Sequence, residues 1–266
     1  MKKVILIKLG GSLITDKEKP YTAKIKIIKN LALQIKTAVD NQPNIRLIIG
    51  NGGGSFPHYP AVKYKMGQGI KNEEQKMGYC LVQDAAAKLN RIIINELLKI
   101  HVKVVSLNPS SMIIAHNGKI KNFFIEPVVK FIDLGIIPVI YGDIVYDEVL
   151  GSKIFSTEQL LSEIALQLKK KNRLVDRVIH NGLTKGVLDI EGNLIPEISN
   201  KNIHNIESAF TSTKGFDITG GMWHKVKESL DLTQYGITTL IINGNAKKNL
   251  LMKAILGTAV EGTIVR

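Results

Sequence analysis

Short runs of consecutive apolar residues alternate along the chain with longer segments in which apolar residues return every three or four positions. The runs predict buried strands, and the longer segments predict amphipathic helices. We expect strands at 4–9, 45–50, 102–107, 136–141, 175–180 and 238–242, helices near 24–40, 56–65, 72–100, 126–135, 157–169 and 222–231, a polar hairpin around Asn117-Gly118 and a final helix–strand pair. Apolar strands that alternate with helices indicate an α/β fold with a parallel sheet covered on both faces.

Three consecutive glycines, Gly52-Gly53-Gly54, follow the second strand at the point where a helix should begin, and His58 comes four residues later. Glycines let the backbone approach an anion closely, and the N–H groups that open the next helix point at it. A tight turn beside a surface histidine is the alternative for an isolated glycine triplet. Because ligands gather at the carboxyl ends of parallel strands, we expect a phosphate-binding loop.

Two other segments have a similar design. Lys8 ends the first strand, and Gly10-Gly11-Ser12 open a loop that carries Lys17. Far along the chain, residues 217–222 (Asp-Ile-Thr-Gly-Gly-Met, with Gly220 and Gly221) lead into a helix that bears Lys225. Neither glycine loop has the Walker spacing or the full dinucleotide-binding pattern. We therefore expect several anion-binding turns, each with its own lysine, around one shared site.

The composition suits an enzyme with a large core. With 266 residues and 44% hydrophobic residues, the chain fits one large α/β domain or two lobes that share a sheet. No apolar stretch approaches the roughly 20 residues needed to span a bilayer, and no signal peptide is evident, so no membrane association is expected. The single cysteine, Cys80, fits a reducing interior. We expect a cytoplasmic protein.

The net charge of +13 raises the question of nucleic acid binding. The lysines are scattered over the expected helices, and their densest cluster, Lys169-Lys170-Lys171, falls at a helix end, where cations offset the helix dipole. Aromatic residues are few and are not interleaved with basic ones. We therefore expect no nucleic acid partner, and the spacing of the histidines predicts no metal site.

The glycine and lysine segments together resemble the amino acid kinase family, over nearly the whole chain. The segments that carry the resemblance are Lys8–Ser12, Gly52–His58, Tyr141–Val145, Asp217–Met222 with Lys225, and Val260–Thr263. Within the family the likeness is greatest to the archaeal-type isopentenyl phosphate kinase branch, because His58 follows the glycine loop. The resemblance implies an open α/β/α sandwich with a mainly parallel sheet, an acceptor lobe at 1–150, an ATP lobe at 151–266, and a homodimer.

The resemblance also implies roles for individual residues in an ATP- and Mg²⁺-dependent phosphoryl transfer. Lys8 and Lys225 would hold the donor phosphates and the moving group, Lys17 would stabilise the transition state, and His58 would fix the acceptor phosphate. The loop glycines would supply backbone N–H groups. The expected nucleotide-binding positions are Gly10, Gly11, Ser12, Gly54, Gly220, Gly221 and Lys185, and the expected acceptor-binding positions are Gly53, His58, Thr157 and Asp143. Asp143 serves equally well as a helix cap and turn residue.

Two segments depart from the family pattern. Gly182–Val187 lacks both aspartates of the family's Thr-Asp-x-Asp-Gly-Val and contains Lys185. Where the family has Ser-Gly-Asp-Asp, this chain has Ser156–Gln159, so Glu158 takes the place of the aspartate that orients the catalytic lysines. These departures leave open an altered nucleotide preference, another acceptor such as a phosphonate of the fosfomycin type, or a ligand-binding protein without turnover.

The organic part of the acceptor is expected to lie against the helical stretch 66–98. Its side chains suit a short branched hydrocarbon better than a charged amino acid. An ordinary core face fits the same pattern equally well. The residues expected to form this wall are Met66, Met77, Tyr79, Cys80, Leu81, Val82 and Ala86. The best single prediction is a kinase that converts isopentenyl phosphate to its diphosphate in isoprenoid biosynthesis.

Overall fold

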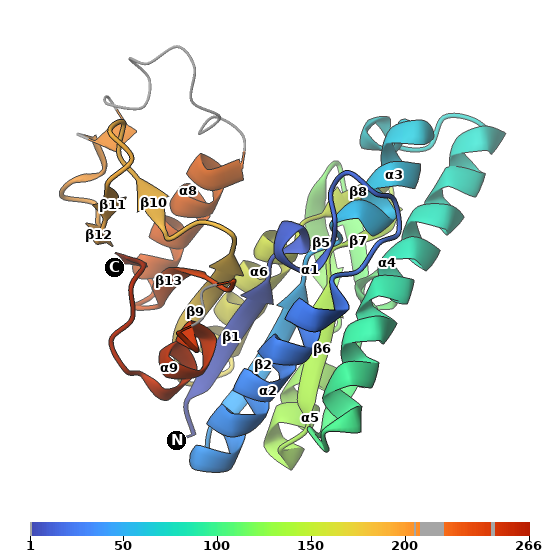
Figure 1. The fold of residues 1–266 in the computed structure, drawn as a ribbon. Helices are drawn as coiled ribbons and strands as arrows, with labels where there is room; N and C mark the ends of the chain where they lie inside the picture. The colour runs from blue at the N-terminus through green and yellow to red at the C-terminus, as the bar shows by residue number, and fades with distance from the viewer. Residues whose placement is uncertain (1, 205, 208–220, 246–247) are drawn as a thin grey trace.

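A large, mostly parallel sheet runs through the centre of the computed structural model and carries helices on both faces (Figure 1). The structure describes residues 2–204, 206–207, 221–245 and 248–266. The sheet has eight strands in the order β12-β14-β13-β9-β1-β2-β6-β3. These are β1 (Val4–Leu9), β2 (Arg46–Asn51), β3 (Val104–Ser106), β6 (Ile137–Tyr141), β9 (Val175–Gly182), β12 (Glu197–Ile198), β13 (Thr238–Asn243) and β14 (Thr263–Val265). The fold is the predicted α/β sandwich.

Two helical layers cover this sheet because its strands are apolar on both sides. Ile5, Ile7 and Leu9 of β1 pack under the first layer, whereas Val4 and Leu6 pack under the second. The first layer consists of α2 (Ile25–Asn41), α4 (Glu73–Lys99) and α9 (Leu250–Leu256). The second consists of α5 (Glu126–Leu134), α6 (Thr157–Lys170) and α8 (Gly221–Thr233). No helix among the described residues is long and apolar enough to cross a membrane.

A smaller four-stranded sheet, in the order β5-β4-β7-β8, lies beside the upper end of α4 in Figure 1. The predicted hairpin at Asn117-Gly118 joins β4 (Ile113–His116) to β5 (Lys119–Phe123). Both turn residues have positive φ, as a two-residue hairpin requires. A second hairpin, β7 (Asp143–Asp147) with β8 (Gly151–Phe155), was not predicted. These strands bring Ile144 and Ile154 toward α4.

Several smaller elements complete the chain. They are α1 (Gly11–Ile14), α3 (Ser55–Lys63), the 3-10 helices at Met66–Gln68 and Pro109–Ser111, and the hairpin of β10 (Val187–Leu188) with β11 (Leu194–Ile195). Because β1, β2, β6 and β9 are parallel, their carboxyl ends share one edge of the sheet. The predicted loops after β1 and β2 therefore meet at that edge.

Candidate functional site

The two glycine loops contact each other through their backbones at the carboxyl ends of β1 and β2. A Cβ added to Gly11 would lie only 2.5 Å from the backbone nitrogen of Gly54. Gly54 has φ +54°, and a Cβ there would overlap the hydroxyl of Thr15. That hydroxyl donates to the Gly11 carbonyl at 2.8 Å and accepts the Ser55 N–H at 3.1 Å. Only glycine allows this contact, which fixes both loops around one space.

A pocket of about 360 Å³ opens beside these loops. It gathers many of the residues that the sequence predicted for the site. Lys8, Gly11, Ser12, Lys17, Gly53, Gly54, His58, Asp143, Thr157 and Glu158 all line it. The N-termini of α3 and α6 adjoin it as well, because Gly54 precedes α3 and Ser156 precedes α6. Helix N-termini, glycine loops and lysines together favour an anionic ligand.

Lys8 is the most buried cation of the pocket, with 8% of its surface exposed. Its ammonium group contacts the carboxylate of Glu158, in the first turn of α6. Burial, and then the positive charge of Lys225, lower the pKa of Lys8 to about 7, while the Glu228 carboxylate raises it. An anion that reached this ammonium group would restore its full charge.

Lys225, on α8, lies close enough to this pocket for its charge to act on Lys8. Burial and the charge of Lys17 lower the pKa of Lys225. Three lysines from distant parts of the sequence therefore share one region of positive potential. Their mutual repulsion would be relieved by a ligand with several negative charges, such as a nucleoside triphosphate.

The remaining predicted nucleotide-binding residues lie around or outside the pocket. Gly10 donates its N–H to the Asn181 carbonyl at 2.8 Å and precedes α1. Gly221 is the first residue of α8. Lys185 is exposed beyond the end of β9. Residues 217–220, with the predicted Asp217, Thr219 and Gly220, lie outside the described part of the chain.

The start of α6 is held to the end of β2 by a buried side chain. Thr157 is 1% exposed, and its hydroxyl donates to the Asn51 carbonyl at 2.7 Å. Gly50 and Gly142 leave room for Thr157, since a Cβ at either would lie within 3.0 Å of its side chain. The Ser156 side chain and Gln159 form a capping box around this helix start. Thr157 thus orients the helix that carries Glu158.

Asp143 is the first residue of β7, so its interpretation as a helix cap was wrong. Its carboxylate accepts the N–H groups of Ser110, at 3.0 Å, and Ile144, at 2.9 Å. Burial raises its pKa to about 6, although hydrogen bonds from Ser110 and Ile144 oppose the rise. A carboxyl group that lines an anion pocket is expected to be hard to ionise.

An apolar cluster lies beside the phosphate end of the pocket. Met66, Val82 and Ile144 form its buried centre, and Tyr79 and Ile154 pack against it. Val82 and Ile154 also line the pocket itself. The prediction of this wall was partly wrong, because Met77, Cys80 and Leu81 are exposed on the outer side of α4. Sequence reasoning also missed Ile144 and Ile154, because the strands that carry them, Asp-Ile-Val-Tyr-Asp and Gly-Ser-Lys-Ile-Phe, do not alternate apolar with polar residues.

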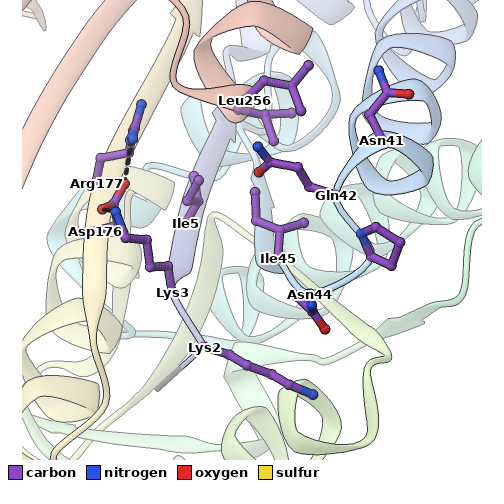
Figure 2. A pocket seen from close by; sticks show the side chains of 12 residues that line it. Lys2, Lys3, Ile5, Asn41, Gln42, Asn44, Ile45, Asp176, Arg177 and Leu256 are labelled. Carbon is purple, nitrogen blue, oxygen red and sulfur yellow. Dashed lines mark hydrogen bonds and ion pairs between the residues drawn. The ribbon is translucent and has the colours of Figure 1, made fainter.

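A larger hollow, of about 870 Å³, lies at the opposite edge of the sheet (Figure 2). Asp176, at the amino end of β9, lies there between Lys3 and Arg177. Its carboxylate is 2.9 Å from the Lys3 ammonium and 2.6 Å from the Arg177 guanidinium. These charges are already paired with each other. The larger volume therefore does not make this hollow the candidate site. The lysines and glycine loops that favour an anion line the smaller pocket instead.

Comparison with known proteins agrees with this geometry. The model of the amino acid kinase family matches residues 3–243. The chain is 34% identical to isopentenyl phosphate kinase of Methanocaldococcus jannaschii, over 97% of this chain and 96% of that protein. It is 31% identical to isopentenyl phosphate kinase of Methanothermobacter thermautotrophicus, over 97% and 99%. A crystal structure of isopentenyl phosphate kinase, 30% identical, superposes with a TM-score of 0.77 over 98% of this chain and 99% of that one.

Proposed function

This chain belongs to the amino acid kinase family, and we propose that it transfers the γ-phosphoryl group of ATP to isopentenyl phosphate, which yields isopentenyl diphosphate. The observation that carries the proposal is one pocket in which two glycine loops, Lys8, Lys17 and His58 face the same space. A phosphate monoester suits this pocket, because two glycine loops and two helix N-termini add N–H donors to the charges of Lys8 and Lys17. The relatives named above act on isopentenyl phosphate, which favours it over a phosphonate.

The acceptor phosphate is assigned to the N-terminus of α3. Its oxygen is already ionised near neutral pH, so the reaction needs no general base. His58, exposed at the pocket rim, would donate a hydrogen bond to this phosphate, and Gly53 would lie against it. The α3 N–H groups add donors that point the same way. These residues would hold the acceptor oxygen in line with the γ-phosphorus.

The donor phosphates are assigned to the lysines and the first glycine loop. Lys8 and Lys225 would bind the β- and γ-phosphoryl groups, and Lys17 would neutralise charge on the moving group. Gly10, Gly11 and Gly54 would supply backbone N–H groups, with Ser12 beside them. Glu158 positions Lys8 through their ion pair. In such reactions the residues contribute position and charge rather than covalent chemistry.

Mg²⁺ is expected to arrive with the nucleotide and to neutralise its phosphate oxygens. Among the described residues no three His, Cys, Asp or Glu side chains gather as a metal-binding group. A metal held mainly by the nucleotide phosphates fits a pocket of this composition. The loop that holds the rest of the nucleotide includes Leu183 and Lys185, both exposed. The absence of the family's aspartates there is a reason to expect a nucleotide preference that differs from that of relatives.

The hydrocarbon of the acceptor is assigned to the cluster of Met66, Val82 and Ile144.

We also propose the division suggested by the sequence, with the acceptor on residues 1–150 and the nucleotide on 151–266. A homodimer and a cytoplasmic location follow the pattern expected of the family. Gel filtration with light scattering would test the dimer, since a monomer would contradict it.

A coupled assay with purified protein tests the proposed reaction. Isopentenyl phosphate is supplied with ATP, GTP or CTP, and fosfomycin replaces the acceptor in a parallel series. Turnover of isopentenyl phosphate with at least one nucleotide is expected. Turnover of fosfomycin alone would mean that the acceptor is a phosphonate and not isopentenyl phosphate. Binding of the acceptor in calorimetry without any turnover would indicate a protein that only binds its ligand.

His58→Ala then tests the assigned acceptor site. The variant should raise KM for isopentenyl phosphate and lower kcat/KM by about 10²-fold, because a charge-assisted hydrogen bond to phosphate is lost. His116→Ala is the control, since His116 is also exposed but pairs with Glu148 on the smaller sheet. Unchanged kcat/KM in the His58 variant would show that the acceptor phosphate binds elsewhere.

A further inference from the structure

His180 lies near Lys8 and Lys225, the two lysines assigned to the donor phosphates. It sits on β9 directly beside Lys8 of β1, and β13 flanks it on the other side through Ile241. Paired residues of parallel strands point to the same face of the sheet. Leu6 and Val178, two residues earlier on the same strands, both pack in the core under α6. The side chains of Lys8 and His180 therefore emerge from that same face.

The imidazole of His180 is buried and incompletely hydrogen-bonded. His180 is 5% exposed, and its imidazole Nδ1 has no hydrogen-bond partner among the described residues. A buried polar atom in this state costs about 1–3 kcal/mol of stability. Such atoms are rare in folded proteins, and a partner that this nitrogen gains during the reaction would account for it.

Two cations act on His180, Lys8 of β1 and Lys225 of α8. Glu158 of α6 and Glu228 of α8 act in turn on Lys8, and Lys17, in the loop after α1, acts on Lys225. Burial first, and then the charges of Lys8 and Lys225, lower the pKa of His180 well below its usual value. The ring is therefore neutral at neutral pH and keeps one nitrogen as a hydrogen-bond acceptor.

Lys225 supplies a matching donor. No hydrogen bond or ion pair joins its ammonium group to another residue in the described ranges, whereas Lys8 is engaged with Glu158. An ammonium group has three N–H donors, and the donor phosphates would not use all of them. We propose that His180 is a positioning residue whose imidazole Nδ1 accepts a hydrogen bond from Lys225 and so aims that lysine at the donor phosphates during phosphoryl transfer.

This inference rests on the proposed kinase function and adds a residue that touches neither substrate. It explains why a neutral histidine lies near two cations. A leucine there would leave Lys225 without a fixed direction, and a positively charged group would repel it. Because the lysine must be aimed within a fraction of an ångström, its misplacement costs rate more than nucleotide affinity.

Three variants test the inference. His180→Leu removes the acceptor and keeps the position apolar. His180→Asn keeps an acceptor oxygen near the position of Nδ1 but cannot be protonated. Thr239→Val is the matched control, because Thr239 is fully buried, carries an unpartnered hydroxyl, and lies on the neighbouring strand β13. The threonine lies two residues before Ile241, which is the residue paired with His180.

The expected results separate positioning from a merely structural role. His180→Leu should lower kcat by about 10–100-fold and change KM for ATP by less than about threefold. His180→Asn should retain at least about a third of wild-type kcat, and Thr239→Val should match wild type. The pH dependence of kcat gives a second readout. Protonation of His180, which begins only well below pH 6.5, removes the acceptor and adds repulsion, so wild type should lose activity there more steeply than His180→Asn.

The inference is wrong if the leucine variant keeps full kcat, or if the asparagine variant is as impaired as the leucine variant. If the leucine variant does not fold, the asparagine variant tests the inference by itself. A loss of kcat at low pH as steep as that of wild type would overturn the assignment. A wild-type protein without kinase activity would instead refute the proposed function. The two failures are therefore distinguishable.

Discussion

The two edges of the central sheet contain the same kinds of residue in opposite arrangements. At the amino edge, Lys3 and Arg177 pair with Asp176 beside a wide hollow. At the carboxyl edge, Lys225 acts on Lys8 and Lys17 acts on Lys225, and in the described part of the chain Lys8 alone of the three has a contacting carboxylate. Charges that are already paired within the protein attract a charged ligand only weakly. The carboxyl edge keeps its positive potential available, which is the reason for proposing the smaller pocket as the functional site.

The largest expected effect comes from removing one lysine at each edge. Lys8→Met should lower kcat by about 10²–10³-fold, because a preorganised charge that faces the moving phosphoryl group is lost. Lys3→Met should leave kcat within about twofold, since an exposed ion pair contributes at most about 1 kcal/mol to stability. Steady-state kinetics with isopentenyl phosphate and ATP would measure both. Equal losses in the two variants would show that the edges do not differ as described.

A smaller effect is expected from adding a methyl group to one glycine at each edge. Gly54 and Gly236 both have positive φ, but only Gly54 lacks space for a Cβ. Gly236 precedes β13, at the amino edge. Gly54→Ala should lower the free energy of unfolding by about 3 kcal/mol, because strain and overlap with Thr15 add together. Gly236→Ala should cost about 1 kcal/mol from strain alone.

Urea denaturation would measure both glycine variants, and kinetics would follow the same preparations. Gly54→Ala should also raise KM for both substrates, because its loop contacts the loop of Gly11. A Gly54 variant that is as stable and active as the Gly236 variant would mean that the loops can separate without consequence.

The smallest expected effect compares one aspartate at each edge. Burial raises the pKa of Asp143 to about 6, so its folded-state pKa exceeds its unfolded value. Its contribution to stability is complete at low pH and decreases as pH rises from about 4 to 6, by on the order of 2 kcal/mol. Burial acts the same way on Asp176, but Lys3 and Arg177 outweigh it and lower its pKa. The contribution of Asp176 to stability is therefore present above pH ~4 and is lost only as the pH falls below that value.

Urea denaturation of Asp143→Asn and Asp176→Asn between pH 3 and 8 would separate the two cases. The first variant should flatten the stability curve between about pH 4 and 6. The second should lower stability above about pH 4 and reduce the slope of the curve below it. A wild-type curve without any slope attributable to Asp143 would contradict the assigned pKa.

The sequence predicted most of the fold because its strong signals are local. Long periodic segments such as α4 and α6 were placed within a residue or two, and continuous apolar runs identified β1, β2 and β13. The hairpin of β7 and β8 was missed because β7 follows almost directly on β6, and because neither strand alternates apolar with polar residues.

The site was predictable where glycines and lysines stand next to strands, and less so where packing decides orientation. Loop residues such as Gly54 and Lys8 follow from the position of the strand ends. The exposure of Met77 and Leu81 does not follow from the sequence in this way, because α4 is covered on one side only. Which side of α4 faces the smaller sheet depends on tertiary packing. The unpartnered nitrogen of His180 is likewise visible only once β1, β9 and α8 are packed together.

A relay of polar side chains links the helix behind the acceptor to the strand before the glycine loop. Ser106 donates to Asn90 of α4 at 2.6 Å, and Asn90 donates to Asn51 of β2 at 2.9 Å. Asn90 and Asn51 are almost completely buried. If the acceptor binds as proposed, a redesign for longer substrates should therefore shorten individual side chains such as Met66. Moving α4 outward would strain these hydrogen bonds and displace the strand that leads into the glycine loop.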